Sequence, residues 1–279
     1  MKTASTICSK HITFDHVSDP IKTEEVIFHQ IKDRDLGMQY AAVPLAFSIN
    51  NFGIDRTQRI IDEIERENSS MKFYVCQHIQ VGLLNFGENI VFTPHTVESD
   101  RYNFIPHYNP VYSIRPSAIK QTHERPWDFS FVGDFNTNSI RSRIGRASIK
   151  NCIVEPTGKW FFSHDSRTQA NLKKRYVSVL EDTKFPLCPE GTGPSTLRLF
   201  ETFSSGGFPV IFNDIKLPID LKKFICKTTI ESLENGTAIL ECKNFDESQQ
   251  QELLDLYWEK YSNNNLSRSI IDFMKGRCK

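Results

Sequence analysis

The chain has 279 residues and no formal net charge, with 34 Lys and Arg against 34 Asp and Glu. Its length suggests two small domains or one large one. The 39% of hydrophobic and 24% of charged residues exclude wholesale disorder. The charge balance argues against a partner selected mainly by charge, such as duplex DNA or an anionic membrane. A local basic pocket for one phosphorylated ligand remains compatible with this composition.

The N-terminus contains no apolar run of the kind found in signal peptides. No stretch approaches the roughly 18 apolar residues of a membrane span. We therefore expect a soluble, cytoplasmic protein. The seven cysteines occur singly, without a Cys-x-x-Cys pair, so no zinc site is predicted. Cys76, Cys152 and Cys188 lie within apolar runs and are expected to be free thiols in the interior.

In the first half of the chain, short apolar runs predict strands at residues 41–49, 72–76, 89–93 and 102–105. A helix is predicted over 56–67, because Ile60, Ile61 and Ile64 recur at helical spacing. Asp55 would be its N-cap. Residues 106–126 contain four prolines and no periodic pattern, which indicates a linker.

The second half alternates strands and helices more regularly. The predicted strands are 128–133, 152–154, 159–162, 185–188 and 208–212, and the predicted helices are 139–147, 169–180, 197–204, 247–261 and 266–274. Such alternation is typical of an α/β protein with parallel sheets. We expect two Rossmann-like halves, with ligands bound at the carboxyl ends of the strands.

The segment from 184 to 214 is the most informative part of the sequence. A strand leads into a loop containing Pro189, Glu190, Gly191 and Gly193, and a helix follows. A glycine-bearing loop ahead of a helix N-terminus exposes backbone N–H groups and the positive end of the helix dipole, which suits phosphate. The segment is not a P-loop, because no Gly-Lys-Ser/Thr follows.

The helix itself carries polar residues that suit a nucleotide. Ser195 and Thr196 can donate hydroxyl hydrogen bonds, and Arg198 adds a fixed positive charge. Glu201, one turn later, could accept the hydroxyls of a ribose. The alternative is an ordinary capped helix, in which Ser195 is the N-cap and Arg198 pairs with Glu201 at i,i+3. From the residues alone, the two interpretations have equal weight.

The same segment resembles the C-terminal part of exostosin-like glycosyltransferases (glycosyltransferase family 47). The shared pattern is Cys-Pro-x-Gly, then Ser-x-x-Arg-x-x-Glu, a small-residue turn and Pro-Val-Ile; here its positions are Cys188, Pro189, Gly191, Ser195, Arg198, Glu201, Gly206, Gly207, Pro209, Val210 and Ile211. Upstream, Phe131-x-Gly133 followed by Arg141 is similar to the family's Phe-x-Gly…Arg element. The resemblance extends over roughly residues 40 to 220 and is most specific from 184 to 218.

This resemblance implies a GT-B fold, in which two Rossmann-like domains face each other across a cleft. We expect an acceptor-side domain at 1–115, a nucleotide-sugar-binding domain at 116–262, and a C-terminal helix at 263–279 that packs back on the first domain. It also implies that Ser195, Thr196, Arg198 and Arg141 hold the donor diphosphate. Glu201 would hold the ribose, and residues 189–193 would form the donor loop.

The implied reaction is transfer of a sugar from a UDP-sugar to a hydroxyl of a glycan, with inversion and without a catalytic metal or other cofactor. UDP-xylose is the first expectation for the donor, followed by UDP-galactose or UDP-glucuronate. The acceptor would be an oligosaccharide or a glycoprotein glycan. The resemblance is to the soluble type encoded by bacteria or large DNA viruses, which for a virus means the host cytoplasm.

Inversion requires a general base to take the acceptor proton. The candidates follow first-half strands or open the helix there; they are Asp55, His78, His95, Glu98 and Asp100, of which we favour Asp100 or His78. The absence of an obvious base leaves open an alternative of another class, a non-catalytic glycan- or nucleotide-binding module on the same fold.

Two further patterns are interpreted as solvated surface. Asp33-Arg-Asp35 has the form of an Asp-x-Asp metal signature but does not follow a buried apolar strand, so no metal site is assigned to it. Arg143, Arg146 and Lys150 spread around the predicted helix that carries Arg141, without interleaved aromatic residues. They therefore do not predict a nucleic-acid surface.

Overall fold

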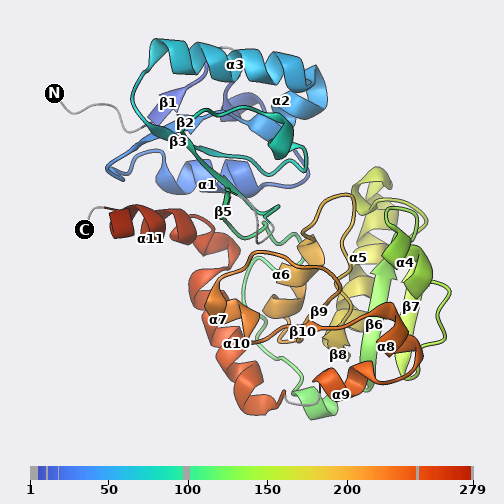
Figure 1. Ribbon diagram of the computed structural model, residues 1–279. Helices are drawn as coiled ribbons and strands as arrows, with labels where there is room; N and C mark the ends of the chain where they lie inside the picture. The colour runs from blue at the N-terminus through green and yellow to red at the C-terminus, as the bar shows by residue number, and fades with distance from the viewer. Residues whose placement is uncertain (1–5, 11, 18, 97–100, 243–244, 278–279) are drawn as a thin grey trace. The chain divides into compact units, whose positions relative to one another are not determined.

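The computed structural model describes residues 6–277 except 11, 18, 97–100, 243 and 244. The chain divides into two compact units (Figure 1). The first contains the residues up to Tyr108 together with those from Asn263 onward, and the second contains Asn109–Ser262. Both units are α/β, and among the described residues every strand pairing is parallel. The predicted α/β class with parallel sheets is therefore confirmed.

The first unit is built on one five-stranded sheet whose strand order follows the chain. Its strands are β1 (Thr6–Cys8), β2 (Gln39–Ala42), β3 (Lys72–Val75), β4 (Ile90–Thr93) and β5 (Asn103–Phe104). Its helices are α1 (Thr23–Ile31), α2 (Leu45–Phe52), α3 (Ile54–Glu67) and α11 (Arg268–Arg277), with short 3-10 turns at Phe14–His16, Val81–Leu83 and Asn263–Asn265.

Helices cover both faces of this sheet (Figure 1). The alternating side chains of β3 show why, since Tyr74 packs with the core beneath α2 and α3 while Phe73 packs with the core beneath α1 and α11. Ile270 and Met274 of α11 belong to that second core. The C-terminal helix thus buries its apolar face in the first unit.

The second unit has a three-stranded sheet in the order β7-β6-β8 and a two-stranded sheet of β9 and β10. Its strands are β6 (Trp127–Gly133), β7 (Cys152–Pro156), β8 (Thr183–Pro186), β9 (Val210–Ile211) and β10 (Cys226–Lys227). A parallel bridge between Leu187 and Val210 links the two sheets. The carboxyl ends of β6, β8 and β9 therefore lie along one edge.

The helices of the second unit vary widely in length. They are α4 (Ser139–Ile144), α5 (Ser166–Glu181), α6 (Leu197–Ser204), α7 (Ile219–Lys222), α8 (Ile230–Glu234), α9 (Ala238–Cys242) and α10 (Glu247–Lys260), with 3-10 turns at Thr122–Glu124 and Phe161–Ser163. A disulfide joins Cys226 to Cys242, a pairing that the sequence does not predict. The thiols of Cys76, Cys152 and Cys188 are free, and Cys152 is only half-buried.

The segment 109–115, which we expected in the first domain, groups with the second unit. Asn109 explains this, because its amide nitrogen donates to Ser204 Oγ at 2.8 Å and to Tyr257 Oη at 3.1 Å. Both partners come from much later in the chain. No local pattern in the sequence predicts contacts between residues so far apart in the chain.

Two predicted strands are wrong. The run 41–49 forms the end of β2 and then α2, because the buried carboxyl group of Glu24 accepts from Ala46 N, at 3.1 Å, and so caps the first turn of α2. Residues 159–162 include the start of a 3-10 turn at Phe161–Ser163 instead of a strand. The N-cap position of α3 is Gly53, with a positive φ of 79°, and Asp55 lies in the first turn.

Among the described residues, no helix combines the length and the apolar character that a bilayer span requires.

Candidate functional site

The predicted donor loop connects β8 to α6 at the carboxyl edge of the second unit's sheet. After β8 the chain continues alongside β9, and Cys188 N donates to Val210 O at 2.8 Å. Pro189 is buried, and Gly191 and Gly193 are partly exposed. This loop delivers the chain to the N-terminus of α6, so backbone N–H groups and the arginines of α4 and α6 meet at one edge of the sheet.

Arg198 lies in the first turn of α6 and turns toward β6. Its Nη2 donates to Val132 O at 2.5 Å, and its guanidinium carbon lies 4.5 Å from the centre of the Phe131 ring. Its Nε is buried and has no hydrogen-bond partner among the described residues. A buried donor without a partner is costly, so this nitrogen has room for an acceptor that the described part of the chain does not provide.

Arg141, from α4, lies beside the same ring. Its Nε donates to Glu190 O at 2.8 Å, its Nη2 donates to Pro189 O at 3.2 Å, and its guanidinium carbon is 5.6 Å from the centre of Phe131. Burial, followed by the charge of Arg198, lowers the pKa of Arg141 to about 9. Within the described part of the chain, neither arginine forms an ion pair with a carboxylate. Two arginines beside one ring concentrate positive charge where an anion would relieve it.

Glu201 is buried, with 7% of its surface exposed, and it faces α5. Tyr176 donates its hydroxyl to Glu201 Oε2 at 2.6 Å. Burial raises the pKa of Glu201, while Tyr176 and the charge of Arg198 act in the opposite direction. Arg198 and Glu201 thus use different partners, so the alternative of an ion pair on a solvated helix face is wrong.

The hydroxyl-bearing residues lie directly ahead of α6. Thr196 occupies the N-cap position instead of Ser195, and its side chain makes no capping hydrogen bond. Ser195 is buried one residue earlier. Leu199 N donates to the Thr196 carbonyl oxygen at 3.2 Å, so the N–H groups of Leu197 and Arg198 are the candidate donors to a phosphate at the start of α6.

Gly133 ends β6 directly beneath Arg198. A Cβ atom at this position would lie 2.8 Å from Arg198 Nη2 and 3.1 Å from Phe131 Cζ. Only glycine leaves room for the guanidinium to reach Val132 O. This close approach gives a physical reason for the glycine of the Phe-x-Gly element.

We expect Gly133→Ala to weaken UDP binding by about tenfold while the fold persists. The added methyl group displaces the flexible end of Arg198 instead of the backbone, so the cost falls on binding and not on stability. Titration of UDP and thermal unfolding of the same protein measure the two effects. Gly82→Ala is the matched control, because a Cβ there meets no atom within 4 Å. Unchanged UDP affinity in Gly133→Ala would show that the position of Arg198 is irrelevant.

Two asparagines beside the donor loop were not predicted. Asn138 Nδ2 donates to Glu190 Oε1 at 3.2 Å, and Asn213 Nδ2 donates to Glu190 Oε2 at 3.0 Å. Asn138 precedes α4 and Asn213 follows β9. Their contacts join residues far apart in the chain. The sequence could have indicated the two asparagines only through their positions in the loops that follow β6 and β9.

The base candidates belong to the first unit. His78 Nε2 contacts Asn50 Oδ1 at 3.1 Å, and His78 Nδ1 accepts from Gln80 N at 3.1 Å, so both ring nitrogens have partners. Burial lowers the pKa of His78, and the charge of Asp19 opposes this. Asp100 lies outside the described residues.

The structure gives no support for the other three candidates for the general base. His95 is buried with Nε2 near Gln77 O at 3.1 Å, and burial lowers its pKa to about 4. Asp55 is exposed in the first turn of α3. Glu98 lies outside the described residues.

Glu24 is a buried carboxyl group that the sequence did not reveal. It is 3% exposed at the start of α1, and its Oε1 accepts from Gln77 N at 2.7 Å and from Ala46 N at 3.1 Å. It therefore links the chain after β3 to the first turn of α2. Burial raises its pKa to about 8 against the effect of these hydrogen bonds.

This shift makes the stability of the first unit depend on pH. Between the ordinary pKa of 4.5 and the raised value of about 8, Glu24 is neutral when folded and ionised when unfolded. Folding takes up a proton at Glu24 in this window, so the free energy of unfolding should fall as the pH rises from 7 to 8, above the range in which the lowered pKa of His95 acts in the opposite direction. Urea unfolding across this range measures it. In Glu24→Gln this contribution to the slope should vanish, and an unchanged slope would contradict the assignment.

The remaining charged patterns lie on the surface. Asp33 and Asp35 are exposed in the turn after α1, and Asp35 Oδ1 accepts from Gly37 N at 3.0 Å. Arg143 Nη2 pairs with Glu231 Oε1 at 2.6 Å.

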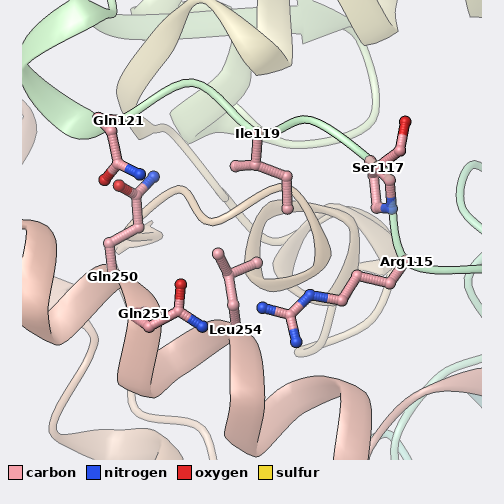
Figure 2. Close-up of a pocket in the computed structure, with 8 residues that line it drawn as sticks. Arg115, Ser117, Ile119, Gln121, Gln250, Gln251 and Leu254 are labelled. Atoms are coloured by element: carbon pink, nitrogen blue, oxygen red, sulfur yellow. The ribbon is translucent and has the colours of Figure 1, made fainter.

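A small hollow in the second unit lies between residues 115–121 and α10 (Figure 2). Its volume is about 170 Å³, and Gln250, Gln251 and Leu254 line its α10 side. Arg115 lies at the hollow and pairs with Asp255 at 2.8 Å. None of the residues predicted to bind the donor lines it.

Comparisons with known proteins identify the family. The profile of the Exostosin GT47 domain matches residues 68–239. Over 114 residues the chain is 25% identical to ribitol-5-phosphate xylosyltransferase 1 of Danio rerio, which covers 39% of this chain and 25% of that protein. The chain therefore spans about a quarter of that relative's length.

Solved structures give weaker likenesses. They include the GtfA/B complex, with a TM-score of 0.43 and 12% identity over 78% of this chain and 48% of the other. MurG of Acinetobacter baumannii has a TM-score of 0.35 and 8% identity over 81% of this chain and 79% of the other. The family profile spans well over half of the sequence and includes Arg141, the donor loop, Arg198 and Glu201. The chain belongs to the exostosin GT47 family.

Proposed function

We propose that the chain is a glycosyltransferase that moves a sugar from a UDP-sugar to a hydroxyl group of a glycan, with inversion at the anomeric carbon. The observation that carries the proposal is the pair Arg198 and Arg141 beside Phe131, with a buried Arg198 Nε that has no partner among the described residues. A diphosphate has the charge and the acceptor oxygens that such a pair requires. Membership of the GT47 family supports the same conclusion.

Each residue of the site has a role in this reaction. Arg198, Arg141 and the N–H groups at the start of α6 bind the diphosphate, with the hydroxyls of Ser195 and Thr196 as additional donors. As the bond between the sugar and the diphosphate breaks, negative charge grows on the departing phosphate oxygen. The fixed guanidinium groups stabilise that charge.

Glu201 binds the ribose of the same nucleotide. Tyr176 holds one carboxylate oxygen through a 2.6 Å hydrogen bond and so fixes the orientation of the group. The other oxygen then accepts a ribose hydroxyl.

The first unit supplies the acceptor side and the base. Of the two bases favoured from the sequence, Asp100 and His78, we propose Asp100, because both ring nitrogens of His78 have partners. The name of the xylosyltransferase relative supports xylose as the first donor sugar to test, followed by galactose and glucuronate. The acceptor is a hydroxyl of an oligosaccharide or of a glycoprotein glycan.

Incubation with UDP-xylose, UDP-galactose and UDP-glucuronate tests the proposal. Release of UDP, followed by NMR analysis of the anomeric configuration of the product, should show turnover of at least one donor with inversion. Binding of UDP without any release from these donors, with or without a panel of oligosaccharides, would instead identify a non-catalytic binding module.

We also propose that transfer needs no metal, because two arginines and a helix N-terminus supply the positive charge at the diphosphate. Addition of EDTA should leave the rate of UDP release unchanged within about twofold, which corresponds to roughly 0.4 kcal/mol. If EDTA abolishes transfer and manganese restores it, Asp33 and Asp35 must be reconsidered as metal ligands.

A further inference from the structure

In the donor loop, the side chain of Glu190 is held by hydrogen bonds to two other segments of the chain. Its backbone carbonyl accepts from Arg141 Nε at 2.8 Å, so the residue adjoins the arginine assigned to the diphosphate. Its two carboxylate oxygens accept from two different amides, Asn138 Nδ2 and Asn213 Nδ2. The carboxylate is thus held from both sides, at the carboxyl edge where β6, β8 and β9 end.

The two partners are neutral, and this determines what the group can do. An amide orients a carboxylate by hydrogen bonding but does not cancel its charge, as a lysine or arginine would. Asn138 is itself fixed, because its Oδ1 caps α4 by accepting from Ile140 N at 2.8 Å. Asn213 is fixed by a second hydrogen bond from Nδ2 to Pro194 O at 3.0 Å. The site therefore presents an oriented negative charge.

We propose that Glu190 selects the charge of the donor sugar: it accepts hydrogen bonds from the hydroxyls of a neutral sugar and repels a sugar that carries a carboxylate. The proposal rests on the proposed function, because it is the diphosphate on Arg141 and Arg198 that brings the sugar to this loop. A sugar is bonded directly to the β-phosphate and must lie within a few ångströms of it. Like charges at such range in a partly desolvated site disfavour binding strongly.

The inference narrows the donor to a neutral pentose or hexose and places uronate donors last. A purely structural role for Glu190, as a link between the loops after β6, β8 and β9, makes a different prediction. Loss of such a link would weaken the binding of all donors alike, or would lower stability. Only charge selection changes the ratio between the affinity for a uronate donor and the affinity for its neutral counterpart.

Calorimetric titration of the full chain with UDP, UDP-glucose and UDP-glucuronate tests this, since the two sugars differ at C6. In the unmodified protein we expect UDP-glucuronate to bind at least tenfold more weakly than UDP-glucose. In Glu190→Gln this ratio should fall below threefold, while the affinity for UDP stays within threefold. Glu252→Gln, at an exposed position of α10, removes the same charge elsewhere and should leave the ratio unchanged.

The outcomes distinguish failure of the proposed function from failure of charge selection by Glu190. If UDP itself does not bind, the proposed function fails and this inference fails with it. If UDP binds but the unmodified protein binds both sugars equally, the inference alone is wrong. The same holds if the ratio in Glu190→Gln is unchanged or if all three ligands weaken together. If Glu190→Gln does not fold, equal binding of the two sugars by the unmodified protein still overturns the inference.

Discussion

Replacement of Arg198 by alanine is expected to weaken UDP binding about a hundredfold, the largest effect of any single substitution in the site. Hydrogen bonds to charged groups are worth about 1.5–3 kcal/mol each, and a diphosphate would take at least one from this guanidinium. Removal also leaves Arg141 alone beside Phe131. Isothermal titration of UDP measures the loss directly.

Two comparisons make the Arg198 result specific. Arg175→Ala removes an exposed arginine of α5 that pairs with Glu155, and should leave UDP affinity unchanged. Arg198→Lys keeps the charge but loses the planar group that reaches Val132 O while lying over Phe131, so we expect an intermediate loss. A folded Arg198→Ala protein that binds UDP normally would contradict the assignment of the diphosphate site.

Glu201→Gln is expected to weaken UDP binding by about tenfold and Glu201→Ala by at least as much. Glutamine keeps an acceptor for the Tyr176 hydroxyl, so the helix packing survives while the charge that strengthens the ribose contact is lost. Titration with UDP, together with thermal unfolding of each variant, separates binding from stability.

Tyr176→Phe distinguishes the two roles of Glu201. Loss of the phenol removes the hydrogen bond that orients the carboxylate, so we expect a smaller reduction in UDP affinity than in Glu201→Ala. Uracil base alone, without ribose, should show no dependence on Glu201. The ribose assignment would be wrong if a folded Glu201→Ala protein bound UDP as tightly as the unmodified chain.

The strands and helices that follow a clear local period are the parts of the fold that the sequence predicts well. β6 and α6 are examples, because each has an apolar pattern bounded by glycine or proline. The strand predicted at 41–49 failed where a distant residue decides the structure. The Glu24 carboxyl group accepts a hydrogen bond from Ala46 N in the first turn of helix α2. No residue near position 45 in the sequence indicates this contact.

The site shows the same division. The sequence indicates Arg198 and Glu201 through a motif of short, local spacing. It indicates Arg141 through a strand and the helix that follows it. It does not indicate their partners, since Tyr176, Asn138 and Asn213 reach the site from separate elements. Sequence patterns can name residues that face a ligand, but the contacts that orient those residues depend on tertiary packing.

The central claim is that the second unit binds a nucleoside diphosphate through Arg141 and Arg198, and thermal unfolding with UDP and with UMP tests it most directly. UDP at a hundred times its dissociation constant should stabilise the protein by roughly 2.7 kcal/mol. UMP lacks the second phosphate that the arginine pair would bind, and should give a much smaller shift at the same concentration. Equal shifts with the two nucleotides, or none with UDP, would contradict the account.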